Sequence, residues 1–400
     1  MMSLAKALRR RSVKVMDGNK AAAYGAMLCR PTVLSAYPIT PQTPLVEYLS
    51  DFIAEGFLQA EMIEAESEHS VLSVLQGACL AGGRVFTGTS SQGLALMYEP
   101  YIRTSTLRLP IVMAIANREV ISPQSVWGGQ QDAVTLRDAG WIQIYCENNQ
   151  EILDSVIMGY RIAEDPEVLL PLNVCYDGFY LSHLSEGVDV PSQEEVDRFL
   201  PPFKIDHIKL DPREPMAVDP LTPGDLLTEY RLKHVQAMER AKKVIDRVDE
   251  AFRGIFGRSY GGQVERYRTE DAEFLLVTMG SPSGTAKVAV DLGRDEGIPV
   301  GLLRIRTLRP FPVERVVEVA RGKRVIAVVD RNVSFGWATG VVFMELSAAL
   351  GSQGKGKGLL SIVGGLGGSD ITVHHLHRII QRMARGEVTG RVIWLGVDDV

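Results

Sequence analysis

Short apolar runs of strand character alternate with helical patterns along the first 190 residues, and this alternation constrains the fold most. The apolar runs cover residues 32–36, 60–63, 84–87, 109–115, 143–146 and 170–175. Helical patterns lie between them, including residues 18–29, 45–55, 70–81 and 149–162. Strands that alternate with helices at this spacing predict a parallel sheet with helices on both faces.

Polar side chains follow several of the predicted strands directly. Thr40 lies in a loop that holds three prolines within ten residues, and Glu68 and Arg118 come soon after later strands. Residues 88–93 form a further loop rich in Gly, Ser and Thr. Because ligands bind at the carboxyl ends of parallel strands, these loops form a candidate site. The alternative is that they are ordinary surface loops and that Thr40 only caps a helix.

A second α/β unit follows a long connection. Residues 191–223 contain many prolines and no clean period, which predicts an irregular connection, and residues 225–257 predict one long helix. His234 on its apolar stripe is interpreted as a packing residue. Strands and helices alternate again from about residue 273, and the glycine-rich run 364–368 lacks dinucleotide-binding spacing and is interpreted as a tight turn.

The predicted domain boundaries follow from these changes of pattern. They are an N-terminal arm (1–14), a first α/β domain (15–190), a linker with the long helix (191–270) and a second α/β domain (271–400). Residues 1–11 of the arm carry four basic residues and no apolar stretch follows them, so the arm is not a secretory signal. We expect a solvated arm, with a short basic contact surface for a partner as the alternative.

Composition excludes several classes of function. A net charge of -6 argues against nucleic-acid binding by bulk charge. No apolar run approaches ~18 residues, so no membrane span is expected. The four cysteines, Cys29, Cys79, Cys146 and Cys175, form no Cys-x-x-Cys or iron–sulfur motif. We expect each to be a small buried hydrophobe in a protein of the reducing cytoplasm.

The three candidate side chains suit one kind of chemistry. A glutamate with a raised pKa at Glu68 can share a proton with a heteroaromatic nitrogen, and Arg118 offers a bidentate fork for a carboxylate. The Thr40 hydroxyl can donate to a developing oxyanion. Together they suit decarboxylation of a 2-oxo acid with a cofactor such as thiamine diphosphate. The alternative is a surface salt bridge from Arg118 to Glu119 or Asp132.

A series of short motifs carries a resemblance to a known family. The motifs are Tyr37-Pro-Ile-Thr-Pro-Gln-Thr-Pro44, Ser67-Glu-His-Ser70, Thr87-Gly-Thr-Ser-Ser-Gln-Gly-Leu94, Ala116-Asn-Arg118, Arg137-Asp-Ala-Gly-Trp141, Glu147-Asn-Asn-Gln-Glu151, Asp177-Gly-Phe179 with Ser182-His183, and Arg309-Pro-Phe-Pro312. In this order they resemble the 2-oxoacid:ferredoxin oxidoreductases, and most of all the alpha subunit of the multi-subunit pyruvate:ferredoxin oxidoreductases. The resemblance runs from about residue 15 to the C-terminus.

The resemblance implies a fold and three site residues. The expected fold class is α/β, with a thiamine-diphosphate pyrimidine-binding-type parallel-sheet domain followed by a transketolase C-terminal-like domain. Glu68 matches the family's glutamate on the cofactor's aminopyrimidine, Thr40 its substrate-binding threonine and Arg118 its carboxylate-binding arginine. The chain is expected to supply no metal ligand, since the family's Gly-Asp-Gly motif is absent from this sequence.

The resemblance also implies a reaction and partners. The reaction is the reversible, CoA-dependent oxidative decarboxylation of pyruvate to acetyl-CoA and CO₂, with electrons to ferredoxin, in anaerobic metabolism. A beta subunit would hold thiamine diphosphate and Mg²⁺. Gamma and ferredoxin-like delta subunits would complete the complex, and [4Fe-4S] clusters would lie in partner subunits. We expect a cytoplasmic dimer of heteromers.

One departure from the family pattern leaves the substrate open. Relatives usually have an acidic residue and a histidine after Trp127-Gly128, whereas this sequence has Gly129-Gln130 before Gln131-Asp132. A branched-chain 2-oxo acid, 2-oxoglutarate or oxalate therefore remains possible, although Thr40 offers no cation for a second carboxylate of oxalate. A non-redox thiamine-dependent transferase or decarboxylase is a second class of enzyme that would use the same two domains. A non-catalytic scaffold is a third class of function.

Overall fold

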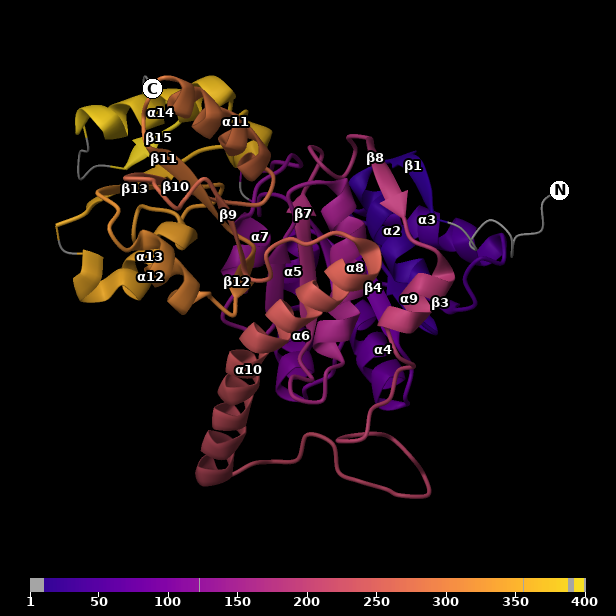
Figure 1. Ribbon diagram of the computed structural model, residues 1–400. Coiled ribbons are helices and arrows are strands. Elements are labelled where there is room, and N and C mark those ends of the chain that lie inside the picture. The colour runs from indigo at the N-terminus through magenta and orange to yellow at the C-terminus, as the bar shows by residue number, and fades with distance from the viewer. Residues whose placement is uncertain (1–10, 122, 355, 388–391, 399–400) are drawn as a thin grey trace.

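Two α/β units lie side by side in the computed structural model, which describes residues 11–121, 123–354, 356–387 and 392–398 (Figure 1). The first unit has a seven-stranded sheet with the strand order β12-β6-β7-β5-β4-β2-β3. The second has a six-stranded sheet with the order β15-β14-β13-β10-β11-β9. The predicted succession of two α/β units is confirmed.

The first sheet carries the candidate site. Its strands are β2 (Val33–Ala36), β3 (Glu61–Glu64), β4 (Val85–Thr89), β5 (Val112–Asn117), β6 (Ile142–Tyr145), β7 (Leu172–Asp177) and β12 (Thr307–Arg309). All pairings among β2 to β7 are parallel, so their carboxyl ends share one edge. Every residue of β4, β5, β6 and β7 is buried, as expected for strands covered on both faces.

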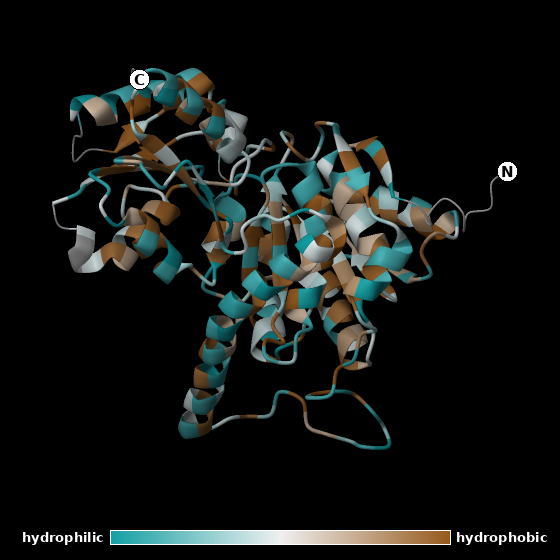
Figure 2. Cartoon of the chain, in the orientation of Figure 1, coloured by the Kyte–Doolittle hydropathy of each residue, from teal (hydrophilic) through white to brown (hydrophobic). Residues whose placement is uncertain are grey.

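Helices cover both faces of this sheet. One face packs against α2 (Gly18–Leu28), α3 (Thr43–Ala54) and α8 (Asn149–Ala163). The other face packs against α4 (Glu68–Leu80), α5 (Ser91–Leu96), α6 (Tyr98–Thr106) and α7 (Gln131–Thr135). Figure 2 shows hydrophobic residues gathered where these helices meet the strands. Hydrophobic cores on both faces fix the sheet between two helical layers.

The second sheet is mainly parallel as well. Its strands are β9 (Val264–Tyr267), β10 (Phe274–Met279), β11 (Val300–Ile305), β13 (Val325–Asp330), β14 (Gly358–Val363) and β15 (Ile393–Trp394), and only β9 pairs antiparallel. Helices α11 (Pro282–Asp295) and α14 (Val373–Arg385) pack on one face. Helices α12 (Val313–Ala320) and α13 (Val341–Leu350) pack on the other, which continues into the core of the first unit.

Two elements differ from the sequence prediction. Strand β1 (Ser12–Met16) pairs antiparallel with β8 (Glu186–Val190), so residues 12–14 of the predicted arm lie in a strand, while residues 1–10 lie outside the described residues. The connection predicted as irregular contains a helix, α9 (Gln193–Phe199). Ser192 and Glu195 form a capping box at its start, and this spacing was an available helix signal.

The predicted long helix is confirmed as α10 (Gly224–Phe256). The first ten residues of α10 are exposed, and this end of the helix extends away from the two sheets (Figure 1). His234 Nε2 lies 3.0 Å from the Gly140 carbonyl, which is the packing contact predicted for it. None of the helices in the described part of the chain has both the length and the apolar character needed to cross a membrane. All four cysteines are free and buried, as predicted.

A buried ion cluster joins the two units where the chain crosses between them. Arg304 and Arg306 lie just before β12, the strand that adds antiparallel to β6 of the first sheet. Both guanidinium groups contact the carboxylate of Glu151 on α8, with 2.7 Å between Arg306 Nε and Oε1. Burial would raise the pKa of Glu151, but the two guanidinium groups outweigh it and lower that pKa. Strand addition and ion pairing therefore fix the second unit against the first.

Removing the Glu151 carboxylate should destabilise this junction strongly. In Glu151→Ala, the buried Arg306 guanidinium loses the carboxylate that contacts it, and we expect a loss of about 3–5 kcal/mol of unfolding free energy. Thermal unfolding measures this as a lowered midpoint. Glu318→Ala is the matched control, because Glu318 pairs with Arg266 at the surface, where solvent screens the ion pair. Equal midpoints for the two variants would contradict a stabilising role for the cluster.

Candidate active site

The loop between β2 and α3 carries Thr40 to the carboxyl edge of the first sheet. Asn19 Nδ2 donates to the Pro41 carbonyl at 2.8 Å, and Arg118 Nη1 donates to the Thr40 carbonyl at 2.5 Å. The loop is thus held through two adjacent carbonyls by two side chains. The Thr40 residue itself is exposed, so its hydroxyl lies at the surface of the edge.

Arg118 follows β5 and is the charged group of the site. The residue is only 4% exposed, and burial lowers the pKa of its guanidinium. Nη1 donates to the Thr40 carbonyl, and Nη2 donates to Gln92 Oε1 at 2.8 Å. Nε is buried and has no hydrogen-bond partner among the described residues. An arginine stays protonated in proteins, so the Nε–H of this cation is a donor that the described residues leave unused.

Asp132 does not form the surface salt bridge considered for Arg118. Its buried carboxylate accepts the main-chain N–H groups of Arg118 at 3.1 Å, Ser91 at 2.9 Å and Ala133 at 2.8 Å, and Asn117 Nδ2 at 2.7 Å. Burial raises the pKa of Asp132, and these hydrogen bonds oppose the rise. One carboxylate therefore joins the ends of β4 and β5 to α7, and the salt-bridge alternative is wrong.

Glu68 begins α4, directly after the N-cap residue Ser67. The residue is 6% exposed, and burial raises the pKa of its carboxyl group. A Cβ on Gly93 would lie 2.5 Å from Glu68 Oε1 and 2.5 Å from Thr89 Oγ1, so only glycine leaves room for both oxygens. Thr89 Oγ1 is buried and has no hydrogen-bond partner in the described part of the chain. The carboxyl group and the free hydroxyl therefore lie on the same side of Gly93.

The structure brings the three predicted residues to one edge, as the strand ends implied. Thr40 and Arg118 are joined by a hydrogen bond, whereas Glu68 reaches Arg118 only through the loop after β4, where Gly93 adjoins Gln92. The sequence identified that loop as part of the site but assigned no role to Gln92. The Thr-Ser-Ser-Gln-Gly composition at a strand end was the available signal.

The unusual Gly129-Gln130 pair lies at the contact between the units and directly follows Gly128, which forms a β-bridge with Arg118. Gln130 is 1% exposed, and its side chain donates to the Met279 carbonyl of the second unit at 3.2 Å. A Cβ at Gly129 would lie 2.2 Å from Glu119 Oε1, so the Glu119 side chain fills the space that a side chain at position 129 would need. The Gln130 side chain therefore faces the second unit, and Glu119 takes up the space beside Gly129.

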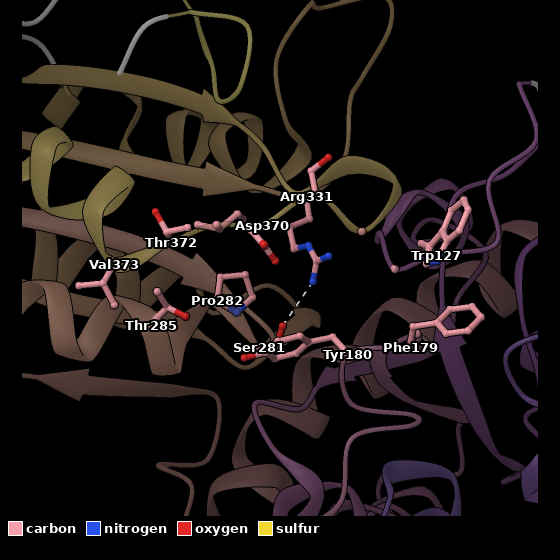
Figure 3. A pocket seen from close by; sticks show the side chains of 15 residues that line it. Trp127, Phe179, Tyr180, Ser281, Pro282, Thr285, Arg331, Asp370, Thr372 and Val373 are labelled. Carbon is pink, nitrogen blue, oxygen red and sulfur yellow. Dashed lines mark hydrogen bonds between the residues drawn. The ribbon is translucent and has the colours of Figure 1, made fainter.

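Two cavities lie between the units near this edge. One of about 500 Å³ is lined by Trp127 and Phe179 on one side and by Ser281 on the other; Figure 3 shows Arg331 pointing at Ser281 across it. Arg331 also pairs with Asp177 of the first unit at 2.8 Å, which joins the two units beside this cavity. A larger cavity of about 850 Å³ borders the candidate site.

The larger cavity is lined by Ser91, Glu119 and Asp132 together with Phe335 of the second unit. Neither cavity is lined by Thr40, Glu68 or Arg118. Of the three candidate residues, Thr40 is exposed at this edge, whereas Glu68 and Arg118 are buried beside it.

Two family models match consecutive parts of the chain. A model described as "Pyruvate flavodoxin/ferredoxin oxidoreductase, thiamine diP-bdg" matches residues 24–250, and one described as "Pyruvate:ferredoxin oxidoreductase core domain II" matches residues 272–376. The range matched by the first model includes all three candidate residues. The gap between the matches falls near the C-terminal end of α10, where the second unit begins.

Curated relatives match along nearly their whole length. The pyruvate synthase subunit PorA of Methanothermobacter thermautotrophicus is 48% identical, over 97% of this chain and 99% of the relative. The alpha subunit of the NADH-dependent phenylglyoxylate dehydrogenase of Aromatoleum evansii is 46% identical, over 99% of this chain and 97% of the relative. Relatives this similar thus carry names that refer to two different 2-oxo acids.

Solved structures match in fold. A 2-oxoglutarate:ferredoxin oxidoreductase from Magnetococcus marinus superposes with a TM-score of 0.70 at 22% identity, over 94% of this chain and 65% of that one. A split-gene transketolase superposes with a TM-score of 0.51 at 13% identity, over 91% of this chain and 97% of that one. The predicted fold class, a pyrimidine-binding-type domain followed by a transketolase C-terminal-like domain, is confirmed.

A side chain at Gly93 should displace Glu68 without unfolding the protein. In Gly93→Ala the new methyl group meets Glu68 Oε1 and the buried Thr89 Oγ1, so Glu68 must shift and we expect the unfolding midpoint to fall only modestly. Activity of the assembled protein should fall by roughly 10²-fold, because misplacing a reacting group by about 1 Å costs that much. Gly77→Ala on α4 is the control, since nothing lies within 4 Å of its Cβ. Full activity in Gly93→Ala would contradict this placement of Glu68.

Proposed function

The chain belongs to the pyruvate flavodoxin/ferredoxin oxidoreductase family, and on this basis we propose its reaction and the roles of its site residues. It is the alpha subunit of a thiamine-diphosphate-dependent 2-oxoacid:ferredoxin oxidoreductase. The complex converts pyruvate and CoA reversibly to acetyl-CoA and CO₂ and passes two electrons to ferredoxin. Two pyruvate-named family models and relatives such as PorA support pyruvate as the first substrate to test.

The observation that carries this proposal is the unused donor of a buried arginine beside Thr40. Arg118 has a free Nε–H at the carboxyl edge of the sheet, while its other two nitrogens are held by protein oxygens. A substrate carboxylate accepts a charge-assisted hydrogen bond from this Nε–H of Arg118. The exposed Thr40 hydroxyl donates to the same substrate, so one carboxylate satisfies both groups.

Glu68 and Thr89 fit the aminopyrimidine edge of the cofactor. When bound, thiamine diphosphate stabilises the negative charge on the carbon that loses CO₂. The Glu68 carboxyl group has a raised pKa, so it can share a proton with a ring nitrogen. The unpartnered Thr89 hydroxyl lies on the same side of Gly93 and offers a second hydrogen bond. These two side chains would hold and orient the cofactor's ring.

The remaining parts of the reaction belong to partner chains. The open edge around Thr40 supports a beta subunit that covers it and holds the diphosphate and Mg²⁺. Gamma and ferredoxin-like delta subunits complete the complex, and [4Fe-4S] clusters in the partner chains pass electrons to ferredoxin. Relatives named as subunits support a multi-subunit assembly, which we propose to be a cytoplasmic dimer of heteromers.

Glu68→Ala should abolish turnover while the complex still assembles. The expected loss in kcat is about 10²–10⁴-fold, because the proton-sharing group is gone. Steady-state assays with CoA and a viologen acceptor measure the loss, and size-exclusion chromatography confirms assembly. Glu64→Ala is the matched control, since Glu64 is an exposed glutamate at the end of β3. Retained turnover in Glu68→Ala would overturn the assignment of Glu68 to the cofactor.

A substrate panel on the native complex separates the candidate 2-oxo acids. We expect the highest kcat/KM with pyruvate among pyruvate, a branched-chain 2-oxo acid, 2-oxoglutarate, oxalate and phenylglyoxylate. The last belongs in the panel because one relative is named for it. A higher kcat/KM for another member would replace pyruvate but keep the reaction type.

Two further outcomes would replace the reaction type itself. A complex without an iron–sulfur subunit that still decarboxylates 2-oxo acids would favour a non-redox thiamine enzyme. Unchanged activity in the double variant Thr40→Ala/Arg118→Ala would favour a non-catalytic scaffold.

A further inference from the structure

Gln92 contacts the group that binds the substrate, although it has no role in the reaction proposed above. We propose that Gln92 is a positioning residue, which holds the Arg118 guanidinium in the orientation that receives the substrate carboxylate. This inference rests on the proposed role of Arg118. It adds a determinant of substrate affinity that lies one contact away from the substrate.

The guanidinium has two protein anchors on separate loops. Nη1 donates to the Thr40 carbonyl at 2.5 Å, and Nη2 donates to Gln92 Oε1 at 2.8 Å. Two anchors on different nitrogens fix the plane of the group, and they leave the Nε–H without a partner in the described structure. Without Gln92 the group has a single anchor and can turn about it. The free donor then no longer points in one direction.

The Gln92 side chain can face Arg118 in only one way. Arginine donates and never accepts, so the amide oxygen of Gln92 must be turned toward Nη2. Because Gln92 is neutral, it holds the guanidinium without cancelling its charge, and the full positive charge remains for a carboxylate.

The backbone conformation of the turn that carries Gln92 brings this residue to Arg118. Ser91 has a φ of +48°, in the left-handed region that residues with side chains rarely adopt. Asp132 Oδ2 accepts the Ser91 N–H at 2.9 Å, and the Ser91 hydroxyl donates to the Glu119 carbonyl at 2.6 Å. A strained conformation persists only where surrounding contacts determine it, and such residues gather at functional sites. These contacts aim the next residue, Gln92, at Arg118.

The test uses binding of oxamate, an unreactive carboxylate that resembles pyruvate, to the assembled complex. Gln92→Met keeps the length of the side chain but removes the acceptor. We expect titration calorimetry to give a dissociation constant for oxamate about tenfold higher than that of the unmodified complex, because hydrogen bonds to charged groups contribute on this scale. The KM for CoA and the unfolding midpoint should not change. Gln193→Met is the matched control. Gln193 lies on α9 and donates to the Leu28 carbonyl and to Asp197, so this variant should bind oxamate as tightly as the unmodified complex.

A double-mutant cycle separates positioning of Arg118 from a general structural effect. Arg118→Met should weaken oxamate binding about 100-fold, and adding Gln92→Met to it should change binding less than about twofold, because Gln92 acts only through Arg118. Additive losses, or normal binding in Gln92→Met beside weak binding in Arg118→Met, would overturn the positioning role alone. Normal binding in Arg118→Met would overturn the proposed role of Arg118 and this inference with it.

Discussion

The candidate site depends on one buried carboxylate. Asp132 accepts four N–H groups, from the end of β4, the end of β5 and the start of α7. It thereby fixes the main chain of Ser91 and Arg118, and with them the side chains that meet above it. The hydrogen bonds satisfy the carboxylate without a cation, so Asp132 does not need the Arg118 guanidinium as a partner. Asp132 therefore fixes the ends of these strands and leaves the Arg118 guanidinium beside them available to a ligand.

The second unit shapes this edge of the first sheet. Its glycine-rich turn reaches across, with the Gly368 N–H on the Gly128 carbonyl at 2.6 Å and the Gly367 N–H on Glu119 Oε1 at 3.3 Å. In the other direction, the Gln130 side chain of the first unit donates a hydrogen bond to the Met279 carbonyl of the second unit. The Glu151 cluster and β12 make the two units one framework, so the loops around Arg118 rest on both.

Much of the fold and the outline of the site follow from the sequence. Alternating strands and helices predict the parallel sheet, and parallel strand ends predict that Thr40, Glu68 and Arg118 share an edge. The contact from Gln92 to Arg118 could not be predicted, because it depends on the positive φ of Ser91, which distant hydrogen bonds impose. The position of the Gln130 side chain could not be predicted either, because tertiary contacts turn it to the Met279 carbonyl of the other unit.

The central claim is that the free donor of Arg118 receives the carboxylate of a 2-oxo acid. A crystal structure of the assembled complex with bound oxamate tests it most directly. The account predicts a carboxylate oxygen about 2.8 Å from Arg118 Nε, with Gln92 Oε1 still on Nη2. An oxamate carboxylate bound elsewhere, with Arg118 Nε still unpartnered, would contradict it.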